Sequence, residues 1–190
     1  MKTIVTHISP DQDAICAVWL VKRFFPGFSA AKIEFVPAGQ TLNNKAPDSD
    51  LDIIHADTGL GRFDHHQTAD RSLCAAVLVL KEIISQKYIQ NDLDREALEK
   101  LTAIVLDVDH AGDKLWPEPE NDRWDFMPNN VLDGLKFKGE KNLFLVDYGM
   151  KTLDGVFWGM KRKLTGSKIL MRGILFDSPW GRGVGVETAV

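Results

Sequence analysis

Three short segments of the sequence combine aspartate and histidine at spacings that suit metal binding. They are residues 7–13 (HISPDQD), residues 55–57 (HAD) and residues 63–67 (FDHHQ). Ionised carboxylates held within a few ångströms repel one another, and only Arg62 adjoins these segments as a compensating cation. Carboxylates mixed with imidazoles are the usual ligands of divalent manganese, iron or zinc. A carboxylate that reaches two ions would create a two-metal site of the kind used for phosphoryl displacement.

The elements expected around these segments bring them to one edge of a sheet. The sequence predicts strands over residues 2–7, 33–37 and 51–56, and helices over residues 14–25, 73–86 and 94–106. This rhythm indicates an α/β domain with a mostly parallel sheet flanked by helices. Ligands gather at the carboxyl ends of parallel strands, so we expect His7, Asp11, Asp13 and Asp57 to converge there. The loop after Asp57 would then deliver His65 and His66 to the same cleft.

The remainder of the chain predicts a smaller second unit. Residues 116–130 (WPEPENDRWDFMPNN) contain three prolines and no periodicity, which is typical of a loop or a boundary. A helix is expected over residues 142–164, and two strands over residues 169–176 and 184–188. We therefore predict a metal-binding α/β domain over residues 1–115. Residues 116–190 would form a small C-terminal α+β annex of loop, helix and β-hairpin that packs on this core and closes the site.

The composition excludes several classes of protein. Hydrophobic residues make up 44% of the 190 residues and the net charge is −4, so neither a disordered chain nor a general nucleic-acid-coating protein is expected. Residues 1–135 contain 13 Lys and Arg against 22 Asp and Glu, whereas residues 136–190 contain 10 against 5.

The two cysteines, Cys16 and Cys74, lie in apolar helical patterns and suggest reduced core thiols. With no apolar run near ~18 residues, we expect a cytoplasmic protein without membrane contact.

Each segment also has an ordinary structural interpretation. An Asp-x-Asp sequence near a helix start often supplies a cap and a solvated charge, and a His-His pair is often exposed. The placement of all three segments at strand ends favours the metal site over these alternatives.

Taken together, these motifs resemble the DHH phosphoesterase superfamily. The resemblance consists of His-x3-Asp-x-Asp after the first strand, an aspartate after a later strand, the segment RFDHHQ at residues 62–67, and an isolated downstream aspartate. It covers about residues 1–113. The superfamily includes RecJ-type nucleases, nanoRNases, cyclic-dinucleotide phosphodiesterases and manganese-dependent inorganic pyrophosphatases.

The resemblance implies a role for each motif residue. His7, Asp11 and Asp57 would hold one Mn2+, and Asp13, Asp57, His65 and a fourth-motif aspartate would hold a second, with Asp57 bridging. Asp107 is the preferred fourth-motif residue because it follows an apolar run, and Asp109 is the alternative. His66 would contact the scissile phosphate, and Asp64 would orient a neighbouring histidine. His55 and His110 are left undecided, and Mg2+, Co2+ or Zn2+ could replace Mn2+.

The sequence departs from this superfamily in its last third. The nuclease-type accessory domain normally brings a Gly-Gly-Gly-His motif, and the pyrophosphatase type brings a Ser-Arg-Lys-Lys type of segment. The chain contains neither motif. The best substitute for a substrate-binding wall is the glycine-rich segment that contains Trp180, Arg182 and Gly183. There Arg182 could pair with phosphate and Trp180 could stack a base, although a plain β-hairpin turn is an equal interpretation.

We expect a metal-dependent phosphohydrolase that cleaves a small phosphoester by attack of a metal-bound hydroxide. A short single-stranded oligonucleotide or a cyclic dinucleotide suits the negative front of the protein better than long duplex DNA. The alternatives are an inorganic pyrophosphatase and a non-hydrolytic nucleotide sensor on the same fold. A homodimer is possible.

Overall fold

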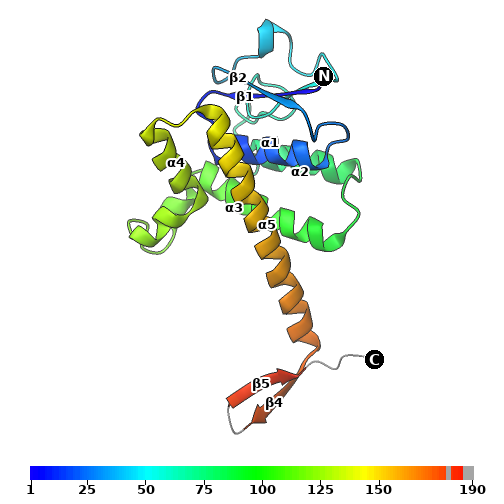
Figure 1. The fold of residues 1–190 in the computed structure, drawn as a ribbon, viewed down its shortest axis with the longest axis vertical. Helices are drawn as coiled ribbons and strands as arrows, with labels where there is room; N and C mark the ends of the chain where they lie inside the picture. Colours follow the sequence, from blue (N-terminus) through cyan, green and yellow to red (C-terminus); the bar gives the residue numbers. More distant parts are fainter. Residues whose placement is uncertain (179–180, 186–190) are drawn as a thin grey trace.

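A computed structural model describes residues 1–178 and 181–185 of the chain, and it has an α/β fold (Figure 1). The helices and strands around the predicted site residues come first along the chain: β1 (Thr3–His7), α1 (Gln12–Phe24), β2 (Lys32–Val36), β3 (Ile53–His55), α2 (Ala75–Ser85) and α3 (Asp92–Asp109). Then follow α4 (Pro128–Lys138), α5 (Asn142–Arg172), β4 (Ile174–Ser178) and β5 (Gly181–Gly185). Three short 3-10 helices, Leu42–Asn44, Gly112–Leu115 and Asp122–Phe126, lie in the connections.

The main sheet contains three parallel strands in the order β2-β1-β3, which confirms the parallel α/β prediction. The apolar runs of β1 and β3 form its buried centre, where Ile4, Val5 and Ile54 are almost completely shielded from solvent. Helices α1, α2 and α3 lie on one side of this sheet, and the segment between β2 and β3 covers the other side (Figure 1). The helices therefore cover one face rather than both.

The register of the sheet explains how two motifs meet. Val5 of β1 pairs with His55 of β3, and the strands are parallel. Two residues further along, His7 and Asp57 therefore leave the sheet side by side. The motif at residues 7–13 and the motif at residues 55–57 thus start from neighbouring strand ends.

Helix α1 connects this edge to the core. Its nine residues Asp13–Val21 are all buried, since it lies between the sheet and the helices α2, α3 and α5. On α5, Leu145, Val146, Leu153 and Phe157 belong to the same hydrophobic core. The first part of α5 therefore shares the core of the first 115 residues.

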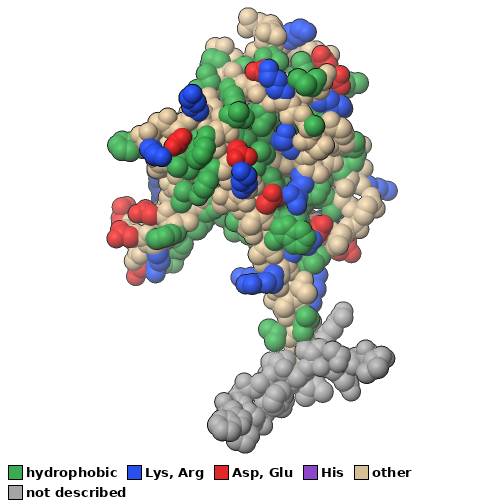
Figure 2. Space-filling model, viewed as in Figure 1, with side chains coloured by type: hydrophobic (Ala, Val, Ile, Leu, Met, Phe, Trp, Pro, Cys, Tyr) green, Lys and Arg blue, Asp and Glu red, His purple; other side chains and the backbone are tan. Residues whose placement is uncertain are grey.

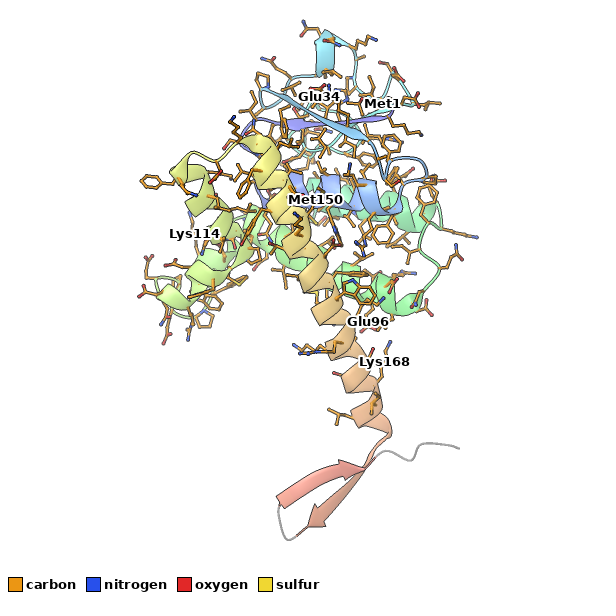
Figure 3. All side chains as sticks on the ribbon, in the orientation of Figure 1. Met1, Glu34, Glu96, Lys114, Met150 and Lys168 are labelled. Atoms are coloured by element: carbon orange, nitrogen blue, oxygen red, sulfur yellow. The ribbon has the colours of Figure 1, made fainter. Side chains whose placement is uncertain are left out.

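The second half of α5 extends beyond this core. Figure 1 shows α5 continuing past α3, with β4 and β5 forming an antiparallel hairpin at its far end, away from the sheet. The prediction of a strand from residue 169 was wrong at its start, because the α5 helix continues to Arg172 and Gly173 follows as its C-cap. An ion pair between Lys168 and Glu96 (3.1 Å) joins this part of α5 to α3 (Figure 3). The second strand is Gly181–Gly185 rather than residues 184–188, of which 186–188 lie outside the described residues.

On the face drawn in Figure 2, acidic, basic and hydrophobic side chains are interspersed. Among the described residues, no helix has the length and apolar character that crossing a membrane requires.

Candidate metal centre

The three predicted segments converge at the carboxyl end of β1 and β3. Three overlapping groups of ligand atoms form there, each with all its atoms within 4.8 Å of one another. The groups are His7, Asp11 and Asp57; Asp13, His65 and Asp109; and Asp57, Asp64, His65 and His66. Asp57 and His65 each belong to two groups, so the residues form one continuous cluster.

Asp57 occupies the centre of this cluster and is 2% exposed. Its Oδ2 lies 3.3 Å from Nε2 of His7, and its Oδ1 lies 3.6 Å from Nδ1 of both His65 and His66. The backbone of Asp57 has a positive φ of 58°, a conformation uncommon for residues other than glycine. Its N–H donates to the carbonyl of Phe63 at 2.9 Å, which folds the loop so that the His65-His66 pair returns to the strand end.

His7 is held in an orientation that suits a metal ligand. Its Nδ1 donates to the carbonyl of Ile8 at 3.0 Å, so its Nε2 faces Asp57. Fixing one ring nitrogen in this way is the usual arrangement of a ligating histidine. Without an ion, burial opposes protonation of His7, but the hydrogen bond to Asp57 and the charges of Asp11 and Asp57 raise its pKa to about 9.

Asp11 and Asp13 have structural roles as well as a place in the cluster. Asp11 Oδ1 accepts the N–H of Ala14 and caps α1. The two carboxylate oxygens of Asp13 accept the N–H groups of Ala75 and Ala76, at 2.7 and 2.8 Å, and so cap α2. Asp11 is therefore the helix cap that the structural interpretation expects, whereas Asp13 caps a different helix and is buried rather than solvated. Each carboxylate oxygen has a second lone pair, which leaves room for a metal ion.

His65 contacts carboxylates with both of its ring nitrogens. Its Nδ1 lies 3.7 Å from Asp13 Oδ2, and its Nε2 lies 3.3 Å from Asp109 Oδ2. Its ring stacks on that of His66 with 4.3 Å between the centroids. His65 is thus the residue that joins the carboxylates of three different elements.

Burial makes the ionised carboxylates of this cluster unfavourable in the absence of a cation. The pKa values of Asp13, Asp57 and Asp109 are all raised, first because burial disfavours the charged carboxylates. Neighbouring carboxylates raise these pKa values further. These aspartates would ionise more readily beside a divalent ion.

Two buried atoms in the cluster fit a bound ion directly. Asp57 Oδ1 and His65 Nδ1 have no hydrogen-bond partner among the residues that the structure describes. Ligand atoms about 2.1 Å from one ion lie about 3.0–3.4 Å apart at the angles that metals adopt. The separation of 3.3 Å between His7 Nε2 and Asp57 Oδ2, and those of 3.6 and 3.7 Å from His65 Nδ1 to Asp57 Oδ1 and Asp13 Oδ2, are close to that range. The residues present therefore fit a divalent ion.

His66 differs from His65 in its exposure. Its side chain is 60% exposed, and its Nδ1 donates to Asp64 Oδ1 at 2.8 Å. Asp64 is buried, and its Oδ2 accepts the N–H of Leu60. Burial opposes the ionisation of Asp64, but its hydrogen bonds to His66 and Leu60 lower its pKa overall. Burial likewise opposes protonation of His66, and the hydrogen bond to Asp64 and nearby carboxylates raise its pKa.

The fourth-motif position is where the geometry differs most from the preferred prediction. The structure brings Asp109 to the cluster, and it does not bring Asp107 there. Both residues lie on α3 rather than after a strand, and two positions on a helix are about 200° apart around its axis. Asp109 follows the buried Val105 by one turn and continues its inner face. Asp107 points elsewhere, and its Oδ2 accepts the N–H of the Trp116 indole at 2.7 Å.

The two undecided histidines make other contacts. His55 is buried, and its Nε2 accepts the N–H of Leu42 at 3.1 Å. His110 donates from Nε2 to the carbonyl of Leu73 at 3.0 Å, and that nitrogen lies 3.9 Å from Asp109 Oδ2. Neither ring joins any of the three ligand groups, and His110 lies beside the cluster residues Asp109 and His65.

The proposed phosphate-binding wall is not brought to the cluster. Arg182 and Gly183 belong to β5, at the far end of α5 from the sheet (Figure 1). Trp180 lies outside the described residues. The 31-residue α5 helix, about 46 Å long at 1.5 Å per residue, separates β5 from the strand ends.

Comparison of this chain with family models, with curated proteins and with solved structures finds no match.

Three of the cluster carboxylates open onto a cleft. This cleft has a volume of about 370 Å3 and is lined by Asp11, Asp13 and Asp109, and further by residues of α3, α4 and the segment between them. We call it the acidic cleft. Its position gives a small molecule access to the cluster.

Proposed function

We propose that this protein is a metal-dependent phosphohydrolase that acts on a small phosphoester at the carboxyl end of β1 and β3. The observation that carries the proposal is the cluster around Asp57 and His65, in which carboxylates and imidazoles from four segments of the chain converge. Asp57 Oδ1 and His65 Nδ1 support it, because both are buried and lack hydrogen-bond partners among the described residues.

The cluster offers ligands for two divalent ions that share Asp57. His7 and Asp11 would hold one ion with Asp57, and Asp13, His65 and Asp109 would hold the other with Asp57. Mn2+ is the proposed metal, since this ligand set mixes imidazole with carboxylate. Two such ions supply charge neutralisation for a phosphoryl group and lower the pKa of water.

His66 is the proposed phosphate contact and general acid. Its Nδ1 is held by the ionised Asp64, and its exposed ring leaves Nε2 available to a substrate. The raised pKa of His66 favours the protonated imidazole, which can donate a hydrogen bond to a phosphate oxygen. It can also donate a proton to the leaving oxygen. Asp64 acts through His66 by fixing its orientation and its charge.

The convergence also supports the proposal that the chain is a divergent member of the DHH superfamily. All the motif segments meet as that resemblance implies, with Asp109 in the fourth position. The described main sheet has three strands, and β4 and β5 form a separate hairpin. The buried, unpaired thiols of Cys16 and Cys74 suit the cytoplasm, the location that we propose.

A turnover panel tests the function. The full chain with Mn2+ should hydrolyse a 5'-phosphorylated dinucleotide or a cyclic dinucleotide, and the Asp57→Asn variant should not. Asp147→Asn is the matched control, because Asp147 is an exposed residue of α5 paired with Lys151. Preferred hydrolysis of pyrophosphate would favour the pyrophosphatase alternative. Binding of nucleotides without turnover of any substrate would instead show a sensor.

A further inference from the structure

A second cleft adjoins the acidic cleft, and its lining is aromatic. It has a volume of about 420 Å3 and is lined by Trp116, Trp124 and Met127 together with polar residues. We call it the tryptophan cleft. The two clefts share four lining residues: Asp113, Lys114, Asn129 and Asn130. A molecule that extends through these shared residues would reach from the tryptophans to the carboxylates of the cluster.

The two indole rings lie against each other and are fixed by hydrogen bonds. Their centroids are 5.2 Å apart, and the planes are inclined by 59°. The Trp116 N–H donates to Asp107 Oδ2 at 2.7 Å, and the Trp124 N–H donates to the carbonyl of Glu118 at 2.9 Å. Both rings are half-buried. Rings held in this way lose little further freedom when a ligand stacks on them.

Asp107 has a defined place in this arrangement. A Cβ atom at Gly112 would lie 2.0 Å from Asp107 Oδ1, so only glycine leaves room for this carboxylate beside the start of the 3-10 helix Gly112–Leu115. The same carboxylate holds the Trp116 indole. Asp107 is therefore a positioning residue for the tryptophan cleft.

The polar groups at the junction of the two clefts complement a nucleotide. The Lys114 side chain is exposed beside α4 (Figure 3), and it forms no ion pair with any described residue. Asn129 Oδ1 is buried without a hydrogen-bond partner in the described part of the chain. This oxygen could accept a hydrogen bond from the amino group of a base, and Lys114 could pair with a phosphate. Asp113 and Glu120 also line the tryptophan cleft, which favours an uncharged ring over a phosphate there.

We propose that the tryptophan cleft binds the base of a nucleotide whose phosphate lies at the metal centre. The inference rests on the proposed function and narrows its substrate class from phosphoesters in general to nucleotides. Stacking on aromatic side chains suits any base, because every base has a π face. The role that the sequence suggested for Trp180 is thus assigned to Trp116 and Trp124.

Equilibrium binding to the Mn2+-loaded full chain tests this proposal without turnover. Adenosine 5'-monophosphate should bind about tenfold more tightly than ribose 5-phosphate, which has the same phosphate and no base. The Trp124→Ala and Trp116→Ala variants should lose this preference. Trp158→Ala should keep it, since Trp158 is an exposed residue of α5 that lines neither cleft. Trp124→Phe, which retains a smaller ring, should keep part of the preference and serves if the alanine variants do not fold.

The outcomes separate this proposal from the proposed function. Equal binding of the two phosphates by the unmodified chain would overturn the base site, even if Mn2+ binds and phosphoesters are cleaved. An unchanged preference in folded Trp124→Ala and Trp116→Ala variants would overturn it as well. Adenosine binding measured without Mn2+ tests the cleft alone. A base site is supported if adenosine binds and the tryptophan variants lose that binding, whatever becomes of the metal centre.

Discussion

Asp57 Oδ1 and His65 Nδ1 lie 3.6 Å apart, both buried and neither with a hydrogen-bond partner among the described residues. A separation of 3.6 Å is too long for a direct hydrogen bond and close to the spacing of two ligands on one ion. Buried polar atoms are normally satisfied, so this pair requires an explanation. A shared divalent ion provides one.

Metal binding should therefore stabilise the protein. Mn2+ at about 100 times its Kd should raise the melting temperature by about 5–10 °C for a chain of this size. Asp57→Asn should remove most of this increase because the central carboxylate loses its charge. Asp147→Asn, on the exposed face of α5, should respond as the unmodified chain does. The absence of any shift with Mn2+, Co2+, Zn2+ or Mg2+ would contradict the metal centre.

The two neighbouring histidines should behave differently when each is replaced. His66→Ala should keep the Mn2+-dependent melting shift and lose about 10^2- to 10^4-fold in turnover, as expected for a general acid. His65→Ala should lose the shift, because His65 contacts Asp13, Asp57 and Asp109. Melting curves and initial rates of the same preparations distinguish the roles. Loss of the shift in His66→Ala would show that the two assignments are reversed.

Asp109 and Asp107 can be separated in the same way. Asp109→Asn should weaken Mn2+ binding by more than about tenfold, since replacing even an outer partner of a metal ligand costs about that much. Asp107→Asn should leave Mn2+ binding unchanged and weaken the preference for adenosine 5'-monophosphate over ribose 5-phosphate. Calorimetric titration of both variants with Mn2+ is the measurement. Equal metal affinities would remove Asp109 from the ligand set.

The stability of the metal-free protein should fall as the pH rises. Burial raises the pKa of Asp13, Asp57 and Asp109, so these carboxyl groups are protonated more readily in the folded chain than in the unfolded chain. The stability that this protonation gives at low pH is lost as the pH rises through the raised pKa values. The pKa of His7 is raised to about 9, and its contribution is present below about 6.5 and is lost as the pH rises through about 9. Both effects have the same sign.

Melting temperatures at about pH 6 and about pH 9 check this expectation, with and without Mn2+. The increase caused by Mn2+ should be larger at the higher pH, because the ligands must be deprotonated to bind. A metal-free melting temperature that rises between these two pH values, or a Mn2+ effect independent of pH, would contradict a buried carboxylate–histidine metal centre.

The sequence predicted the three parallel strands and the meeting of their motifs for a simple physical reason. Apolar runs such as residues 51–56 are typical of buried parallel strands, and the ends of such strands lie at one edge. The pairing of Val5 with His55 then places His7 beside Asp57. Local patterns and topology were sufficient for this part of the site.

The choice between Asp107 and Asp109 as the fourth-motif residue depended on the secondary structure of the segment that carries them. Asp107 was preferred because it follows an apolar run at the end of the helix predicted over residues 94–106, but α3 continues to Asp109. The buried positions Leu98, Leu101, Val105 and then Asp109 follow a helical period, and this signal in the sequence could have identified Asp109.

The contribution of residues 116–190 to the candidate site could not be predicted from local sequence patterns. Residues 116–130 show no periodicity, and only the folded chain brings Trp116 and Trp124 together beside the acidic cleft. The glycine-rich segment around Arg182 resembles an anion-binding turn in the sequence. The length of α5, which decides where β5 lies, depends on packing against α3 as well as on helical propensity.

The hydrolysis rate of a 5'-phosphorylated dinucleotide tests the proposed metal-dependent phosphohydrolase activity most directly. It is compared for the Mn2+-loaded chain, the same chain after metal removal, Asp57→Asn and Asp147→Asn. We expect turnover by the Mn2+-loaded chain and by Asp147→Asn, with at least about 10^2-fold loss on metal removal and in Asp57→Asn. Turnover that is equal in all four samples would contradict this proposal.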